Sequence, residues 1–191
     1  MSEVDPQAFT SNTVFTDSLP GWRRRKLEGY LSGGLFISHS SSDYPSRFYQ
    51  EPQSKIEKIV DIIVPRFGPN GYFLHSLKSG GAEVYRELVN IALSCCDKFL
   101  LLVSAGSVRS PWVSAEVQFA LVNQRPIIEA CLDGTHVEQL YNGLPADLFH
   151  NYHSARSSID FHSNVDQGRE MLAQLLDQLL ARFPYPCKQM D

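Results

Sequence analysis

Short apolar runs alternate with longer amphipathic stretches along most of this chain. The runs are bounded by glycines, prolines or serine clusters, which is typical of buried strands. The stretches between them carry apolar residues at helical spacing. The pattern predicts strands at 35–37, 72–74, 99–103, 126–132 and 158–161, and helices at 54–64, 83–95, 111–123 and 165–183.

Two segments show this pattern most clearly. The run Phe99–Val103 is apolar on both faces, which indicates a central strand covered by helices on both sides. In the first predicted helix, Ile56, Ile59 and Ile63 share a face opposite charged residues, and Pro65 is expected to end it. Because strands and helices alternate throughout, the sequence predicts an α/β protein with a doubly wound parallel sheet.

The ends of the chain differ from its middle. Residues 1–30 are polar and irregular and are expected to form an N-terminal arm, followed by a domain at 31–185 and a C-terminal tail at 186–191. The arm contains a basic cluster at 23–26, but Glu28 follows it and the whole chain is acidic. This charge pattern favours a solvated arm over a patch that binds a partner.

Composition narrows the function classes without naming one. The 191 residues carry 17 basic and 21 acidic side chains, whereas proteins that bind nucleic acid or anionic membranes are usually basic. The four cysteines include no CxxC pair, so neither a zinc site nor a disulfide framework is indicated. The N-terminal residues are too polar for a signal peptide, and the longest uncharged apolar stretch, 99–108, is too short to cross a bilayer. We therefore expect a cytoplasmic protein with no nucleic-acid or membrane partner.

The predicted fold places a ligand site at the carboxyl ends of the strands. In open α/β sheets that site lies where the strand order reverses, here between the first and third strands, so the loops 39–43 and 104–110 would line it. The chain has none of the signatures of P-loop NTPases, Rossmann dehydrogenases, α/β-hydrolases or zincins. A phospho-acceptor receiver domain is also excluded, because Ser104 stands where the third strand would need an aspartate.

The predicted helix that begins at Ser110-Pro111 is unusual in its charge. Serine is a favourable cap and proline suits the first turn, and residues 112–122 then contain one charged residue, Glu116. Trp112 lies four residues earlier, on the same helical face. A carboxylate among apolar residues over the crevice should have a shifted pKa or bind a polar ligand. The alternative is a glutamate at the solvent edge of a well-buried helix, and the spacing alone favours this alternative.

Three segments carry the strongest family signal in the chain. They are Phe36–Asp43, Phe99–Ser104 and Ser110–Glu116. In this order and at this spacing they resemble the opening strand and loop, the third strand and the S-x-W-V-x-x-E segment of Toll/interleukin-1 receptor (TIR) domains. The match covers about residues 34–132. The resemblance implies a flavodoxin-like fold with a five-stranded, mainly parallel sheet in the order 2-1-3-4-5 and helices on both faces.

The resemblance also implies an activity, the cleavage of NAD at its nicotinamide–ribose bond, with Glu116 as the catalytic residue. Nicotinamide in NAD is a cationic pyridinium that leaves as a neutral molecule, so one carboxylate suffices where ordinary glycosidases need two. NAD is then the substrate, and neither a cofactor nor a metal is implied. Trp112 would pack beside the nicotinamide. The other expected substrate-binding residues are Ser38, His39, Ser40, Ser41, His75, Lys78 and Ser104.

The chain departs from the family at some of these positions. His75 stands where many members carry an acidic residue, and Ser40 and Ser41 stand where some relatives have arginines. Lys78 matches a basic position of some relatives. His75 is either a ligand contact or an ordinary loop histidine, and the sequence favours neither.

A TIR-like unit with little else attached fits an enzyme whose product acts elsewhere. We expect a stand-alone bacterial enzyme of antiphage defence that makes a cyclic or otherwise modified ADP-ribose, which a separate effector protein senses. One alternative is a hydrolase that depletes NAD. The other is a non-catalytic interaction module that works through the loop 76–82, although such an adaptor would have no need of Glu116 and Trp112. In an enzyme, the same loop of a neighbouring copy is expected to close the site, so activity would be low in the monomer and higher in an oligomer.

Overall fold

The computed structural model describes residues 21–40, 43, 55–74, 82–141 and 156–185. Within these ranges strands and helices alternate, as the pattern predicts. In chain order the elements are α1 (Gly21–Leu31), β1 (Leu35–Ser38), α2 (Lys55–Phe67), β2 (Tyr72–Leu74), α3 (Ala82–Cys95), β3 (Lys98–Val103), the 3-10 turn η3 (Ser107–Arg109), α4 (Pro111–Val122), β4 (Ile127–Cys131), α5 (Glu138–Tyr141), β5 (Arg156–Asp160) and α7 (Val165–Arg182).

The strands of the described residues form one five-stranded sheet in the order β2-β1-β3-β4-β5, and every pairing in it is parallel. This confirms the predicted flavodoxin-like α/β fold and its strand order. The strand β3 occupies the centre, and all of its residues are buried. Ser38, the last residue of β1, is in register with Leu101 of β3. The loops that follow these two strands therefore start side by side at the carboxyl edge of the sheet.

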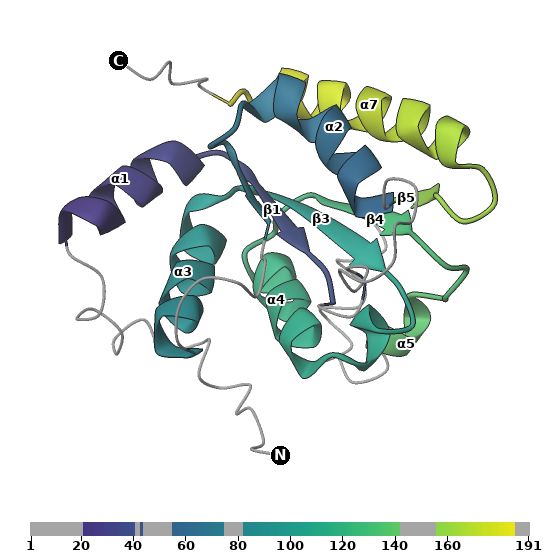
Figure 1. Ribbon diagram of the computed structural model, residues 1–191, viewed down its shortest axis with the longest axis horizontal. Helices are drawn as coiled ribbons and strands as arrows, with labels where there is room; N and C mark the ends of the chain where they lie inside the picture. The colour runs from purple at the N-terminus through teal and green to yellow at the C-terminus, as the bar shows by residue number, and fades with distance from the viewer. Residues whose placement is uncertain (1–20, 41–42, 44–54, 75–81, 142–155, 186–191) are drawn as a thin grey trace, which may run out of the picture.

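Helices cover both faces of this sheet (Figure 1). On one face α2 and α7 pack together over a core that includes Leu100 and Leu176. On the other face lie α1, α3 and α4, over a core that includes Leu101 and Val117. Successive residues of a strand point to opposite faces, so β3 contributes to both cores. That double burial is the physical reason for its unbroken apolar run.

The start of α4 is as predicted. The side chain of Ser110 accepts a hydrogen bond from the backbone N–H of Val113 at 3.4 Å, and Pro111 occupies the first turn. The cap satisfies one of the backbone donors that a helix start leaves open. It also fixes which residues of α4 face the sheet, and thereby the position of Glu116.

The predicted N-terminal arm is partly wrong. Residues 21–31 form the helix α1, which packs on α3 with Leu31 buried and Leu27 against the same core. Leu27 and Leu31 lie one turn apart and give too short an apolar stripe to stand out in a basic stretch. Arg25 and Lys26 of the basic cluster are exposed. The packed fold therefore begins before residue 31.

Two predicted element ends also shift. The helix α2 continues past Pro65 to Phe67, because a proline in the last turn removes few helical hydrogen bonds and Phe67 is buried. Gly68 follows the helix, and its φ of 67° is a conformation that glycine adopts without strain. The strand β5 spans Arg156–Asp160 instead of 158–161, since its pairing with β4 begins at its first residue.

Candidate functional site

The side chain of Glu116 contacts the last residue of the strand β1 at the carboxyl edge of the sheet. Ser38 is the last residue of β1, and its hydroxyl donates a hydrogen bond of 2.5 Å to Oε2 of Glu116 on α4. The two residues are 78 positions apart in the chain. The fold therefore brings together two of the predicted site residues, at the position where doubly wound sheets bind ligands.

The Glu116 carboxylate is buried because the helix around it is buried. Glu116 is 5% exposed, and its neighbours Ala115 and Val117 are buried as well. Burial raises the pKa of Glu116 to about 8, and the hydrogen bond from Ser38 offsets only part of this rise. The shifted pKa is the outcome that the charge pattern of α4 suggested, and the alternative of a glutamate at the solvent edge is wrong.

Trp112 lies one turn before Glu116 and is half-buried. The guanidinium carbon of Arg86, an exposed residue of α3, lies 5.7 Å from the centre of its ring. At this distance a cation is attracted by the electron-rich face of an indole. The helix face that carries the buried carboxylate thus also carries an aromatic ring that attracts cations.

Asp43, at the end of the predicted loop 39–43, was not expected to have a role of its own, yet it joins the two loops at this edge. Its Oδ1 accepts a hydrogen bond of 2.6 Å from the hydroxyl of Ser104, and its Oδ2 accepts one of 3.0 Å from the backbone N–H of Ser40. Ser104 follows β3 and is itself held by Ser107, whose hydroxyl accepts from the Ser104 N–H. In loops, an aspartate side chain often accepts a hydrogen bond from the backbone N–H of a residue a few positions away. The spacing of Ser40 and Asp43 was the signal that could have found it.

His39 and Ser40 are both buried, each with 9% of its surface exposed. Nδ1 of His39 donates to the carbonyl oxygen of Ser40 at 2.9 Å. The imidazole therefore orders the backbone just after β1, next to the Ser38–Glu116 contact. Both residues lie at the predicted site, and the described contacts give them a role in shaping its first loop.

Other predicted residues fall outside the described ranges. These are Ser41, His75 and Lys78, as well as residues 76–81 of the predicted loop 76–82. The last residue of that loop, Ala82, is the first residue of α3. Their part in the site stays a prediction. The described contacts that define the candidate site are those of Ser38, His39, Ser40, Asp43, Ser104, Trp112 and Glu116.

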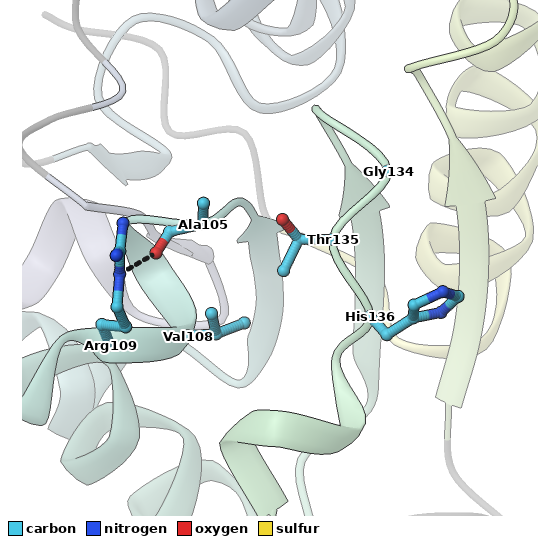
Figure 2. Close-up of a pocket in the computed structure, with 6 residues that line it drawn as sticks. All are labelled: Ala105, Val108, Arg109, Gly134, Thr135 and His136. Atoms are coloured by element: carbon cyan, nitrogen blue, oxygen red, sulfur yellow. Dashed lines mark hydrogen bonds between the residues drawn. The ribbon is translucent and has the colours of Figure 1, made fainter.

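A cavity of about 370 Å³ opens at the same edge of the sheet, next to the Ser104 loop. Two loops line it, one after β3 and one after β4 (Figure 2). Three of its lining residues, Ala105, Val108 and Arg109, belong to the loop 104–110 that the predicted strand order placed beside the site. The others, Gly134, Thr135 and His136, were not predicted. The sequence signal for it was weak, because the second loop lies in a stretch without clear periodicity.

Neither a metal-binding cluster, nor a membrane-spanning helix, nor a similar known protein adds an assignment to this geometry of the described residues. Within the part of the chain that the structure describes, no group of three His, Cys, Asp or Glu side chains could hold a metal ion. No helix of the described ranges is long and apolar enough to cross a membrane. No protein-family model matches the chain, and a search of curated proteins finds no significant match.

Proposed function

We propose that the protein cleaves NAD at the bond between nicotinamide and ribose, with Glu116 as the catalytic residue. The observation that carries this proposal is the buried Glu116 carboxyl group, bonded to Ser38 at the carboxyl end of β1. The resemblance of the surrounding segments to TIR domains supports it, as does the cation-attracting ring of Trp112.

The chemistry of NAD requires little acid–base help at the leaving group. Nicotinamide departs as a neutral base from its cationic pyridinium form, so its departure needs no proton. The charge that develops lies on the ribose, which becomes oxocarbenium-like as the bond breaks. An ionised Glu116 in an apolar setting would stabilise that charge more strongly than a solvated carboxylate could. Trp112 would pack against the pyridinium ring.

The raised pKa of Glu116 leads to a pH prediction. The carboxylate form is the active one, and in the free protein it is the minor form below about pH 8. We expect kcat/KM to rise about ten-fold per pH unit through the neutral range and to level off near pH 8. The kcat profile should level off at lower pH, because the bound pyridinium cation favours the ionised carboxylate. A kcat/KM that does not change between about pH 6 and 9 would contradict this assignment.

The hydroxyl of Ser38 should lower the pKa of Glu116 and so increase its ionised fraction at neutral pH. Its hydrogen bond to Glu116 favours the carboxylate, so Ser38→Ala raises the pKa of Glu116 further. We expect kcat/KM at pH 7 to fall about ten-fold and the profile to shift toward higher pH. Ser94→Ala is the matched control, because the Ser94 hydroxyl is exposed and bonds only within α3, to the carbonyl of Asn90. If the wild type and Ser38→Ala had the same pH profile of kcat/KM, Ser38 would have no part in the ionisation of Glu116.

The product that we propose is a cyclic or otherwise modified ADP-ribose, sensed by a separate effector in bacterial antiphage defence. Mass spectrometry after incubation of the purified protein with NAD tests this directly. A cyclic isomer of ADP-ribose or an adduct supports the signalling role. Plain ADP-ribose supports NAD depletion instead, and the absence of any nicotinamide release leaves a non-catalytic interaction module.

Self-assembly through the loop 76–82 is the last part of the proposal. A neighbouring copy would then complete the site beside Glu116, so that activity depends on the oligomer. We expect the turnover per molecule to rise with protein concentration, measured together with the oligomeric state by light scattering. Full turnover from a sample that remains monomeric would contradict assembly and leave the catalytic assignment intact.

A further inference from the structure

The cavity beside the candidate site is built from two loops of the carboxyl edge. Ala105, Val108 and Arg109 come from the segment after β3, and Gly134 and Thr135 come from the segment after β4. Figure 2 shows these two segments as facing walls. Its volume of about 370 Å³ falls in the range of pockets that hold small ligands. The cavity is open at an edge where α/β sheets bind ligands, yet Glu116 is not part of its lining.

The two walls are tied together by Asp133. Its Oδ2 accepts a hydrogen bond of 2.9 Å from the N–H of Ala105, and its Oδ1 accepts one of 3.1 Å from the N–H of Thr135. Although partial burial favours the neutral acid, these hydrogen bonds hold the pKa of Asp133 below its ordinary value. The carboxylate thus stays ionised and bridges both loops. These two hydrogen bonds hold the walls at their separation in the absence of a ligand, so the cavity is preformed.

The lining combines a flat cation, an apolar patch and a hydroxyl. Arg109 is exposed, and its Nε donates to the carbonyl of Ala105 at 2.8 Å, which holds the guanidinium group beside one wall (Figure 2). Val108 lies below it, and the side chain of Thr135 extends from the other wall. Gly134 has a φ of 76° and lines that wall with its backbone, whereas a Cβ there would point toward the ring of His162. The planar guanidinium group of an arginine stacks well on aromatic rings.

The charges around the cavity favour a neutral ligand. The positive charge of Arg109 is matched by the ionised Asp133 carboxylate, so the walls offer little net attraction to a free anion. A flat heteroaromatic group with hydrogen-bonding edges suits the guanidinium plane, the Val108 side chain and the Thr135 hydroxyl together. A purine base has this shape and this polarity.

We propose that the cavity holds the adenine base of NAD, an inference that rests on the proposed function. Glu116 bonds to the end of β1, whereas the cavity lies over the ends of β3 and β4. Neighbouring strands are about 4.8 Å apart, so one to two strand spacings, roughly 5 to 10 Å, separate the two places along the sheet edge. Two riboses and a pyrophosphate join the two bases of NAD and span that separation. Arg109 and Thr135 would then set the specificity for the adenine end.

Isothermal titration of the full-length protein with ADP-ribose tests this inference, because ADP-ribose carries the adenine and lacks the nicotinamide. We expect Arg109→Ala to raise the Kd for ADP-ribose about ten-fold, equivalent to about 1.4 kcal/mol, and Thr135→Val to raise it by a smaller factor. Arg182→Ala is the matched control, since Arg182 is an exposed arginine at the far end of α7. Nicotinamide mononucleotide should bind all four proteins equally, and ribose 5-phosphate should not displace ADP-ribose.

The outcomes separate this inference from the proposed function. Unchanged ADP-ribose affinity in Arg109→Ala overturns the adenine cavity, even when nicotinamide is released from NAD. Displacement of ADP-ribose by ribose 5-phosphate overturns it as well, because the phosphate and not the base would then provide the affinity. A weakened affinity in Arg109→Ala supports the cavity even when NAD is not cleaved, and in that case the proposed function fails alone. Circular dichroism checks that each variant is folded.

Discussion

Glu116→Gln is expected to lower the rate of nicotinamide release by about a thousand-fold, the range seen when a single charge-stabilising group is removed from an active site. The amide keeps the size of the side chain and can still accept the hydrogen bond from Ser38. It cannot carry the negative charge that the oxocarbenium-like ribose requires. Initial rates with saturating NAD at about pH 8, where the wild-type carboxylate is substantially ionised, give the comparison.

The same substitution should make the protein more stable at high pH. The pKa of Glu116 is about 8 in the folded protein against an ordinary value of 4.5, so the folded state binds this proton more tightly than the unfolded chain does. The stabilisation is fully present below about pH 4.5 and is lost as the pH rises through about 8. Above that pH, Glu116→Gln should exceed the wild type by on the order of 5 kcal/mol in unfolding free energy, because each unit between the two pKa values corresponds to about 1.4 kcal/mol.

An exposed carboxylate provides the control for both effects. Glu170 lies on α7, on the opposite face of the sheet from α4, and is exposed. Glu170→Gln should leave the rate of nicotinamide release unchanged, and its unfolding in urea gives the comparison for the same substitution at an exposed position. If Glu116→Gln cleaved NAD as fast as Glu170→Gln does, the carboxylate would have no catalytic part. If it gained no stability above pH 8, the burial of a titrating Glu116 would be wrong.

Gly71→Ala is expected to be the most destabilising of these substitutions, lowering the unfolding free energy by about 3 kcal/mol. A Cβ at this position would overlap the carbonyl oxygen of Phe67 and lie 2.6 Å from the ring of Tyr185. The carbonyl of Gly71 also accepts a hydrogen bond of 3.0 Å from the N–H of Leu35, at the start of β1. A backbone shift at Gly71 would therefore disturb the strand that ends at Ser38. A melting point lower by about 10 °C is the expected readout.

Gly29→Ala is the matched control for that change. Gly29 lies in α1, and a Cβ there would meet nothing within 4 Å. Alanine favours the helix over glycine by up to about 1 kcal/mol, so this variant should be as stable as the wild type or more stable. Equal melting points for Gly71→Ala and the wild type would show that the turn before β2 relaxes without cost. A loss of stability in Gly29→Ala would contradict the helical assignment of α1, which the sequence pattern did not predict.

The parts of the fold that the sequence predicted are those in which local pattern and burial agree. The strand β3 is buried on both faces and reads as an unbroken apolar run, and Ser110-Pro111 marks the start of α4 by its own chemistry. The single charge of α4 pointed to Glu116 for the same reason, since an ionisable group in an apolar helix needs a partner. The partner itself, Ser38, was expected at the site only from the resemblance to TIR domains and not from any local signal.

The parts that were missed depend on contacts between distant segments. The helix α1 is held by packing on α3, which its own basic sequence does not indicate. The link from Asp43 to Ser104 spans 61 positions and becomes visible only when both loops are placed. The cavity beside Arg109 has walls from two loops that are joined through Asp133. The predicted strand order placed the first loop, 104–110, at the ligand site, but the second has no periodic pattern, so only the tertiary arrangement reveals the cavity.

The central claim is that this chain releases nicotinamide from NAD by means of Glu116. The most direct measurement follows NAD and free nicotinamide by proton NMR, for the wild type and Glu116→Gln side by side, over a range of protein concentrations at about pH 8. We expect nicotinamide to accumulate as NAD disappears in the wild-type sample and to stay at the level of a protein-free blank in Glu116→Gln. Nicotinamide release at the same rate in both samples, or in neither at any concentration, would contradict the claim.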